Sequence, residues 1–297
     1  MINMSIKSSG HTNRELGHSV QVDYLIFSSN KLLFAIPYYH LLQIIDSPEH
    51  TQIPNSKEYI RGFLNFMGEA IPLYDMRKKI GHISLPDEIN QLIKFIQQQK
   101  QEHQSWVKKI KHAVYNNEEL NIEIEDTLGS FDQWSYDLNI DNNAVSNYLS
   151  HFEKPQKSVH TIAATIDELI KKNNQKEAIS LFKEADEKEF RELLELFDGF
   201  EDFVRGSIFE YAIVIENAQH KAAITADELK YFEKFDEVVL ELPFTMEADE
   251  LSIVDAIGRK KVGEHIHEVL ILNIDEFMKD NHHLDILVNH ATEITKS

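Results

Sequence analysis

The sequence predicts a mixed α+β protein of more than one domain, in which a helical segment interrupts a β-rich one. Both outer parts of the chain contain short apolar runs of strand length. The middle part, from Pro86 to Arg205, has only two glycines and two prolines, which favours long helices. We therefore expect a discontinuous β-domain (residues 21–85 and 206–280) and a helical insertion (residues 86–205). A flexible N-terminal tail (1–20) and a C-terminal tail or helix (281–297) would flank them.

The first β-rich segment contains two predicted strand pairs. Runs rich in β-branched and aromatic residues alternate with turn residues. We expect a short helix over Leu41–Ile45, between the two pairs. The basic run Arg77-Lys78-Lys79 would end a later helix, where cations interact favourably with the helix dipole. The predicted strands are Val22–Phe27, Leu32–Pro37, Tyr59–Asn65 and Glu69–Tyr74, the last two joined around Met67-Gly68.

Apolar residues in the middle segment recur with helical spacing. A second helix should begin after Pro155, because proline is not tolerated inside a helix. Two further amphipathic helices are expected near Lys176–Ala185 and Lys188–Val204, so the segment reads as a helical bundle. The predicted inward positions are Ile89, Leu92, Ile96, His103, Trp106, Ile110, Val114, Val159, Ala163, Ile166, Ile170, Phe190, Leu193, Leu194, Phe197 and Phe200.

The last segment returns to strands and short turns. We expect a hairpin with its turn at Gly258, a short helix over Ile274–Lys279 and a helical tail from His282 to Thr295. The predicted strands are Phe209–Ile215, Glu237–Leu242, Leu251–Ile257 and Glu268–Ile274.

Composition excludes several classes of function. A formal charge of −20 argues against non-specific binding to nucleic acid or to an anionic membrane surface. The chain has no cysteine, which excludes disulfides, cysteine nucleophiles and thiolate metal ligands, whereas 15 histidines leave other metal sites open. We expect no secretion signal in residues 1–20 and no membrane insertion, because no run of about 18 apolar residues occurs. A cytoplasmic location follows as an expectation.

Seven short motifs occur in one order in the first segment. They are Tyr24-Leu25-Ile26-Phe27, Leu33-Phe34-Ala35-Ile36-Pro37, Ile53-Pro54-Asn55, Tyr59-Ile60-Arg61-Gly62, Asn65-Phe66-Met67-Gly68, Ile71-Pro72-Leu73 and Asp75-Met76-Arg77. This run resembles the CheW-like domain of bacterial chemotaxis scaffolds, and residues 206–280 resemble the second half of that domain more weakly. The resemblance implies two SH3-like β-barrel lobes that link a chemoreceptor to a histidine kinase.

One motif departs from the family. Where CheW-like domains usually have Asn-Leu-Arg-Gly, this chain has Asn65-Phe66-Met67-Gly68. The resemblance implies that Asn65, Met67 and Gly68 lie in the region that contacts the partner protein. Methionine in place of arginine removes a bidentate donor and offers an apolar surface. The alternative is that Met67 is a packed loop residue with no contact role.

Three motifs of the middle segment resemble a second family. They are His103-Gln104-Ser105-Trp106, Asp126-Thr127-Leu128-Gly129-Ser130-Phe131 and Gln156-Lys157-Ser158-Val159-His160. They are similar to the chemoreceptor zinc-binding (CZB) domain, a four-helix bundle whose members tend to dimerise. The family's ligand positions are His103, Asp126 in place of cysteine, Gln156 in place of histidine, and His160. The implied metal set is His103, Asp126 and His160, with Gln156 as a second-shell residue.

These substitutions change the expected chemistry of the site. A carboxylate in place of a thiolate weakens the preference for zinc over other divalent ions and removes the group that would sense oxidants. The cofactor is therefore zinc or another divalent metal. The alternative for His103 is a core histidine that has a hydrogen-bond partner.

Three functions follow as hypotheses. The first is a non-enzymatic signalling adaptor that links a chemoreceptor and a histidine kinase and is modulated by metal at the insertion. The second is a metal-dependent hydrolase that uses His103, Asp126 and His160, although no usual hydrolase pairing such as His-Glu-x-x-His occurs. The third is a structural module in which the insertion only forms a homodimer.

Overall fold

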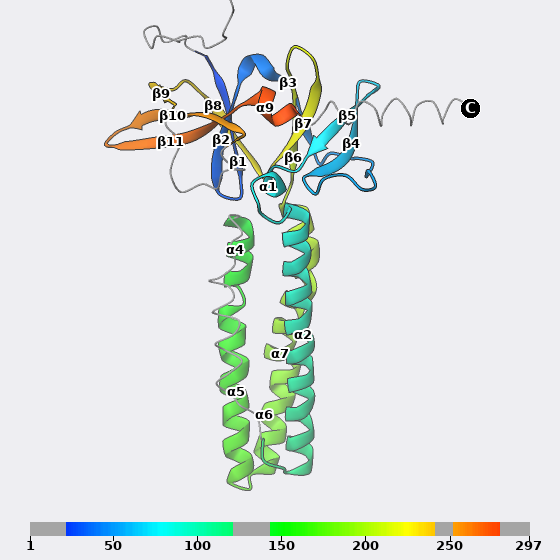
Figure 1. Cartoon of the computed structure of the whole chain (residues 1–297). Coiled ribbons are helices and arrows are strands. Elements are labelled where there is room, and N and C mark those ends of the chain that lie inside the picture. Colours follow the sequence, from blue (N-terminus) through cyan, green and yellow to red (C-terminus); the bar gives the residue numbers. More distant parts are fainter. Residues whose placement is uncertain (1–21, 121–142, 241–251, 280–297) are drawn as a thin grey trace, which may run out of the picture.

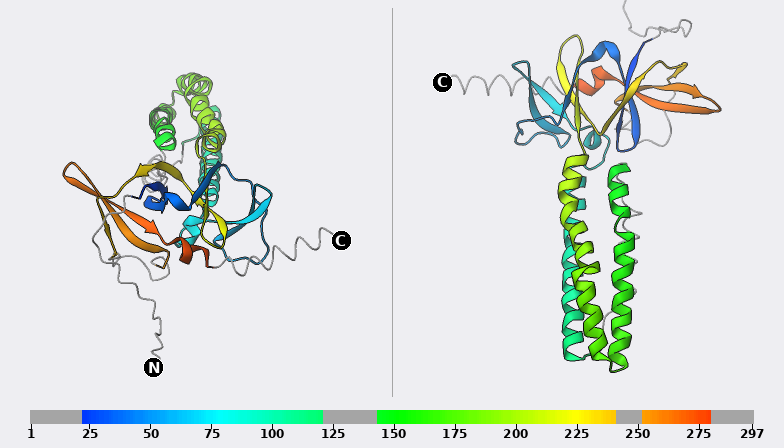
Figure 2. Two further views of the ribbon diagram at one scale, coloured as in Figure 1. Left: turned by 90° about the horizontal axis from the view of Figure 1, so that it is seen from above. Right: turned by 180° about the vertical axis from the view of Figure 1, so that it is seen from behind.

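The computed structural model describes residues 22–120, 143–240 and 252–279. Strands and helices are segregated in it, as expected for a mixed α+β protein. Figures 1 and 2 show the strands gathered at one end of the molecule, with helices α2, α5 and α7 extending away from them side by side. The predicted tail 1–20, the predicted helix His282–Thr295 and the candidate ligand Asp126 lie outside the described residues.

One sheet of the β-domain has six strands. The hairpin of β1 and β2 lies in it as predicted, and β2 pairs in parallel with β11, a strand from the far side of the insertion. The strand order is β8 (Glu228–Glu233), β1 (Tyr24–Ser29), β2 (Leu32–Pro37), β11 (His265–Leu272), β10 (Val254–Val262) and β9 (Glu237–Val239).

The second sheet has five strands. It also joins the two outer parts of the chain, because β3 pairs with β6 and β5 pairs in parallel with β7. Its order is β3 (Leu41–Asp46), β6 (Tyr211–Glu216), β7 (Lys221–Ala226), β5 (Glu69–Tyr74) and β4 (Ile60–Phe66). The expectation that these sheets form two SH3-like barrels goes beyond the strand pairing and stays a prediction.

Two short helices complete the β-domain. Helix α1 (Met76–Lys79) begins at Asp75, whose carboxylate accepts a hydrogen bond from the backbone of Lys78. Helix α9 (Ile274–Met278) begins at Asn273 in the same way, which confirms the predicted helix over Ile274–Lys279. Both helices pack on the main core of the β-domain.

The helix predicted over Leu41–Ile45 is wrong. A single 3₁₀ turn, η1 (Tyr38–His40), precedes this run, which itself forms strand β3. Ile44 lies opposite Ile213 of β6 in an antiparallel ladder. The ladder pairs backbone groups along the run, whereas a five-residue helix would leave most of its own unpaired.

The turn predicted at Gly258 is also wrong. Strand β10 continues through Gly258, and the hairpin to β11 turns at Gly263, where φ is +64°. A Cβ atom at Gly258 would lie 2.4 Å from the ring of Phe235. Glycine is therefore required there for close packing and not for a turn. Strands β7 and β8 were not predicted from the sequence.

The insertion consists of long amphipathic helices. The buried positions of α2 include six of the residues predicted to face inward, among them His103 and Trp106. Helix α5 begins two residues before Pro155, which lies in its first turn, where no hydrogen bond is lost. The described helices are α2 (Leu85–Asn116), α4 (Asn143–Ser150), α5 (Glu153–Lys171), α6 (Gln175–Glu187) and α7 (Glu189–Ser207).

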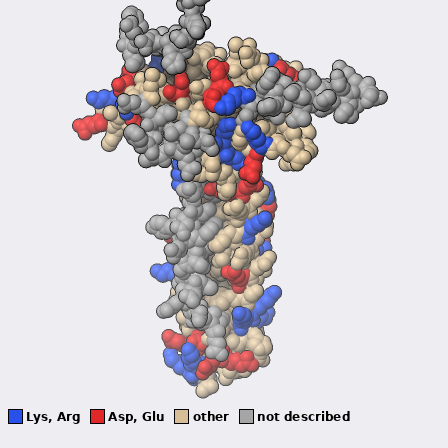
Figure 3. Space-filling view, viewed as in Figure 1, with Lys and Arg blue, Asp and Glu red and all other residues tan. Residues whose placement is uncertain are grey.

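The insertion has its own core. Twenty-two buried apolar residues, all between Leu92 and Val204, form one cluster that contains no residue of the β-domain. The four-helix arrangement stays a prediction, since residues 121–142 lie outside the described residues. In the described ranges, no helix combines the length and apolarity needed to cross a membrane. Figure 3 shows side chains of both charge signs spread over the visible face, with one group of both signs at the end of the helices far from the sheets.

Candidate functional site

The turn between β4 and β5 presents the three residues of the predicted contact region. Met67 and Gly68 form a two-residue turn with φ values of +52° and +87°, and the backbone N–H of Gly68 donates to Asn65 Oδ1 at 2.9 Å. Positive φ at both positions is typical of a type I′ hairpin turn. The Met67 side chain is 87% exposed, so the alternative that it packs within the loop is wrong.

The strands behind this turn hold it firmly. Leu64 and Phe66 of β4 and Ile71 and Leu73 of β5 are buried in a small core beneath the five-stranded sheet. Because the residues on both sides of the turn are anchored, Met67 is displayed on a rigid hairpin. The turn therefore offers an apolar side chain at a fixed position.

His103 is buried in the insertion, with one ring nitrogen fixed. His103 is only 5% exposed, and its Nδ1 lies 2.8 Å from the backbone carbonyl oxygen of Gln99. A carbonyl accepts only, so Nδ1 carries the proton and Nε2 has a lone pair. Burial lowers the pKa of His103, which favours this neutral form. Nε2 has no hydrogen-bond partner among the described residues.

Three further side chains that carry polar atoms are buried on α2 and α5. The rings of His103 and His160 lie 6.3 Å apart, and the ring of Trp106 lies 4.9 Å from that of His160. Gln156 stands one turn before His160 on α5 and is 2% exposed. Within the described part of the chain, both polar atoms of Gln156 and Trp106 Nε1 also lack partners. We call His103, Trp106, Gln156 and His160 the buried polar cluster.

The buried polar cluster fits a bound metal or polar ligand in part. Its described members supply two imidazoles and one amide, and a buried amide without partners is costly unless something binds it. Yet the described residues contain no group of three His, Asp or Glu side chains that could hold an ion. Asp126, the third predicted ligand, lies outside them. The alternative of a core histidine accounts for Nδ1 of His103 but leaves Nε2 unexplained.

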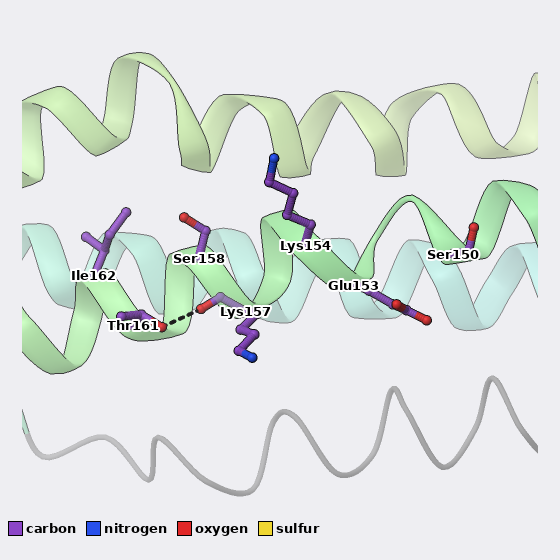
Figure 4. Close-up of a pocket in the computed structure, with 7 residues that line it drawn as sticks. All are labelled: Ser150, Glu153, Lys154, Lys157, Ser158, Thr161 and Ile162. Atoms are coloured by element: carbon purple, nitrogen blue, oxygen red, sulfur yellow. Dashed lines mark hydrogen bonds between the residues drawn. The ribbon is translucent and has the colours of Figure 1, made fainter.

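A surface hollow on α4 and α5 has a different character. It is lined by Ser150, Glu153, Lys154, Lys157, Ser158, Thr161 and Ile162. Figure 4 shows Lys154 and Lys157 pointing to opposite sides, and the Thr161 hydroxyl donates to the backbone carbonyl of Lys157 at 2.8 Å. The polar groups do not converge, so the hollow holds no catalytic arrangement.

Two buried arginines lie where the insertion joins the β-domain. The run Arg77-Lys78-Lys79 forms the basic end of α1 as predicted, but the side chain of Arg77 is only 7% exposed and also pairs with Asp227 and Glu88. Arg61 of β4 pairs with Asp75 and Glu210 in the same manner. We call these the Arg77 cluster and the Arg61 cluster. Two of the four partner carboxylates, Glu210 and Asp227, lie about 150 residues away in sequence, so no local motif predicts them.

Comparison with known proteins supports the resemblance of the first segment. Residues 23–106 match the model of the CheW-like domain family, from β1 into α2. A solved structure titled "Crystal structure of scaffolding protein TtCheW from Thermoanaerobacter tengcongensis" covers 88% of this chain and 89% of its own, with 11% identity and a TM-score of 0.40, a likeness too weak to carry an argument. No curated protein matches the chain. The β-rich segment that precedes the insertion, together with the first part of α2, is thus similar to the CheW-like domain family.

Proposed function

We propose that the protein is a non-enzymatic chemotaxis adaptor that links a chemoreceptor and a histidine kinase. The match of residues 23–106 to the CheW-like domain carries this proposal. The rigid β4–β5 turn supports it, because it presents a residue of the family's contact motif at the surface. Adaptors of this kind act by binding and supply no reaction of their own.

The contact at the turn would be apolar. Met67 offers a thioether chain where the family motif has a guanidinium, so a partner that binds here needs an apolar patch in place of a carboxylate. A single exposed anchor of this kind can account for a large share of binding energy when it is buried by the partner.

A pull-down of purified chemotaxis histidine kinase and of a receptor cytoplasmic tail tests the proposal. We expect the full chain to retain one of them, and Met67→Ser to weaken that binding by about tenfold. Ile266→Ser is the matched control, because Ile266 is exposed on the other sheet. Retention of neither partner would contradict the proposed function. Equal binding by Met67→Ser and Ile266→Ser would contradict the proposed contact.

We propose in addition that a divalent metal modulates the adaptor through the insertion. His103 and His160, with Asp126, would hold the ion, and the ion would join the helices that carry them. The unpartnered lone pair of His103 supports this proposal. Metal analysis of purified protein after zinc loading tests it. The expected result is bound metal in the wild type and its loss in both His103→Ala and His160→Ala, and metal-free wild type would overturn it.

A further inference from the structure

The insertion and the β-domain have separate hydrophobic cores. The core of the insertion and the three apolar clusters of the β-domain share no residue. Across the described ranges, the closest packing of the long helices is on one another. The two chain connections and the side chains beside them are therefore the main route by which a change in the helices can reach the sheets.

The Arg77 cluster lies beside the first connection. Arg77 Nε donates to both carboxylate oxygens of Asp227 at 2.9 Å, and its Nη1 pairs with Glu88 in the first turn of α2. Asp227 lies between β7, a strand of the five-stranded sheet, and β8, a strand of the six-stranded sheet. It also accepts a hydrogen bond from the backbone N–H of Asn30 at 2.7 Å. The start of α2 is thus attached to the point where the two sheets meet.

The Arg61 cluster lies beside the second connection. Arg61 Nε donates to Asp75 Oδ2 at 2.8 Å, while both its terminal nitrogens pair with Glu210, the residue before β6 and just after α7. Arg61 lies on β4, and Asp75 follows β5 directly. The end of α7 is thus attached to the far edge of the five-stranded sheet.

Both clusters share one electrostatic environment. Two arginines face four carboxylates, and Glu210 senses the negative charge of Asp227 as well as that of Asp75. Side chains of the two arginines and of Asp75 are nearly buried, so these pairs are only weakly screened by solvent and salt. Such pairs hold their geometry better than exposed ones, because moving one partner leaves a buried charge uncompensated.

We propose that the Arg61 and Arg77 clusters mechanically couple the helical insertion to the two sheets, through Glu210 and Glu88. Displacement of α2 or α7 then shifts β5 and β7, because Asp75 directly follows β5 and Asp227 directly follows β7. The inference deepens the proposed function, since it supplies the path by which the insertion would influence the adaptor. Coupling of this kind requires neither metal nor a bound partner.

A double variant can remove the coupling and leave the β-domain intact. Glu88→Ala with Glu210→Ala deletes only the carboxylates beside the two connections, Glu88 in the first turn of α2 and Glu210 between α7 and β6. Each arginine keeps a partner in Asp75 or Asp227. The matched control is Asp87→Ala with Glu201→Ala. It removes the same charge near the same two connections, from α2 and α7, at exposed ion pairs.

The experiment perturbs the insertion far from the sheets and measures the rate of hydrogen exchange in the sheets. Phe182→Ala opens a cavity beside α6, a helix that Figure 1 shows in the half of the bundle away from the sheets. Phe182→Leu serves if the alanine variant does not fold. Hydrogen exchange of β5 and β7 is measured in the full chain without metal. We expect Phe182→Ala to speed their exchange about tenfold in the wild-type and control backgrounds, and less than about twofold in the double variant.

Two results would overturn the coupling. One is equal acceleration in the double variant, which would assign the coupling to the backbone alone. The other is no acceleration in the wild-type background. Neither depends on the pull-down or the metal analysis, so a failed adaptor proposal and a failed coupling are separate outcomes.

Discussion

Replacing Gln156 by leucine should stabilise the metal-free protein. Gln156 is 2% exposed, and the described residues offer no partner to either of its polar side-chain atoms. Burial of an amide without hydrogen bonds costs about 1–3 kcal/mol, and leucine has a similar volume with no polar atom. The substitution should therefore raise the free energy of unfolding of the insertion by about 1–3 kcal/mol.

Urea unfolding in the presence of a chelator measures this change. Both tryptophans of the chain, Trp106 and Trp134, lie in the insertion segment, so their fluorescence follows that segment and not the β-domain. The matched control is Gln99→Leu, because Gln99 is equally buried but its amide donates to Glu102 at 3.1 Å. The control should not gain stability.

A loss of stability in Gln156→Leu, with chelator present, would refute the reasoning. It would mean that the amide has partners, such as ordered water, that compensate its burial. Addition of zinc provides a second arm. Bound metal raises the stability of the wild type by RT ln(1 + [M]/Kd), and it should raise that of Gln156→Leu by less if the amide helps to hold the ion.

Three further predictions concern single residues. Gly62→Ala should destabilise the β-domain by roughly 2–4 kcal/mol, because Gly62 has a φ of +151° and the new Cβ would lie 2.0 Å from the carbonyl oxygen of Thr51. Gly206→Ala is the control, because a Cβ there meets no atom within 4 Å. Equal thermal midpoints of the two variants would contradict this prediction. Burial raises the pKa of Glu210; its arginine partner lowers that pKa, and the nearby aspartates raise it further. The contribution of Glu210 to stability is therefore full below the unfolded pKa of about 4.3 and is lost as pH rises through the folded pKa. Urea unfolding from pH 4 to 8 should show this dependence in the wild type and not in Glu210→Gln. Tyr148→Phe should cost about 1 kcal/mol, since the hydroxyl donates to a carbonyl of α7 at 2.9 Å, and unchanged urea midpoints would argue against that bond.

The helical part of the fold was predictable because its signal is long and regular. In α2 the apolar residues keep a helical period for eight turns, so the buried face, His103 included, follows from spacing. Short segments carry no such redundancy. The five residues from Leu41 have no period that separates helix from strand, and only pairing with β6 decides between them. The mostly exposed residues of β8 hide that strand for the same reason.

The candidate site was predictable in its local parts only. Gln156 and His160 share a face because they are four residues apart, and the resemblance to a zinc-binding family adds His103. Among the described residues, Nε2 of His103 and the amide of Gln156 lack hydrogen-bond partners. This follows from the packing of the helices on one another, which a sequence motif cannot predict. The partners of Arg61 and Arg77 are still less accessible, since Glu210 and Asp227 lie about 150 residues away in sequence.

The partners of these two arginines also explain how a β-domain can accept a helical insertion. Each arginine pairs with one carboxylate of the β-domain itself, Asp75 or Asp227, so neither would be a buried unpaired charge if the insertion were absent. The two connections then add a second carboxylate to each, Glu88 in the first turn of α2 and Glu210 between α7 and β6. Attachment therefore creates no new buried cation. Burial is the main cause that raises the pKa of Glu210, the arginine partner lowers it, and the charges of Asp75 and Asp227 add a smaller raising effect. The electrostatic cost of joining the two parts therefore falls in part on Glu210, at the second connection.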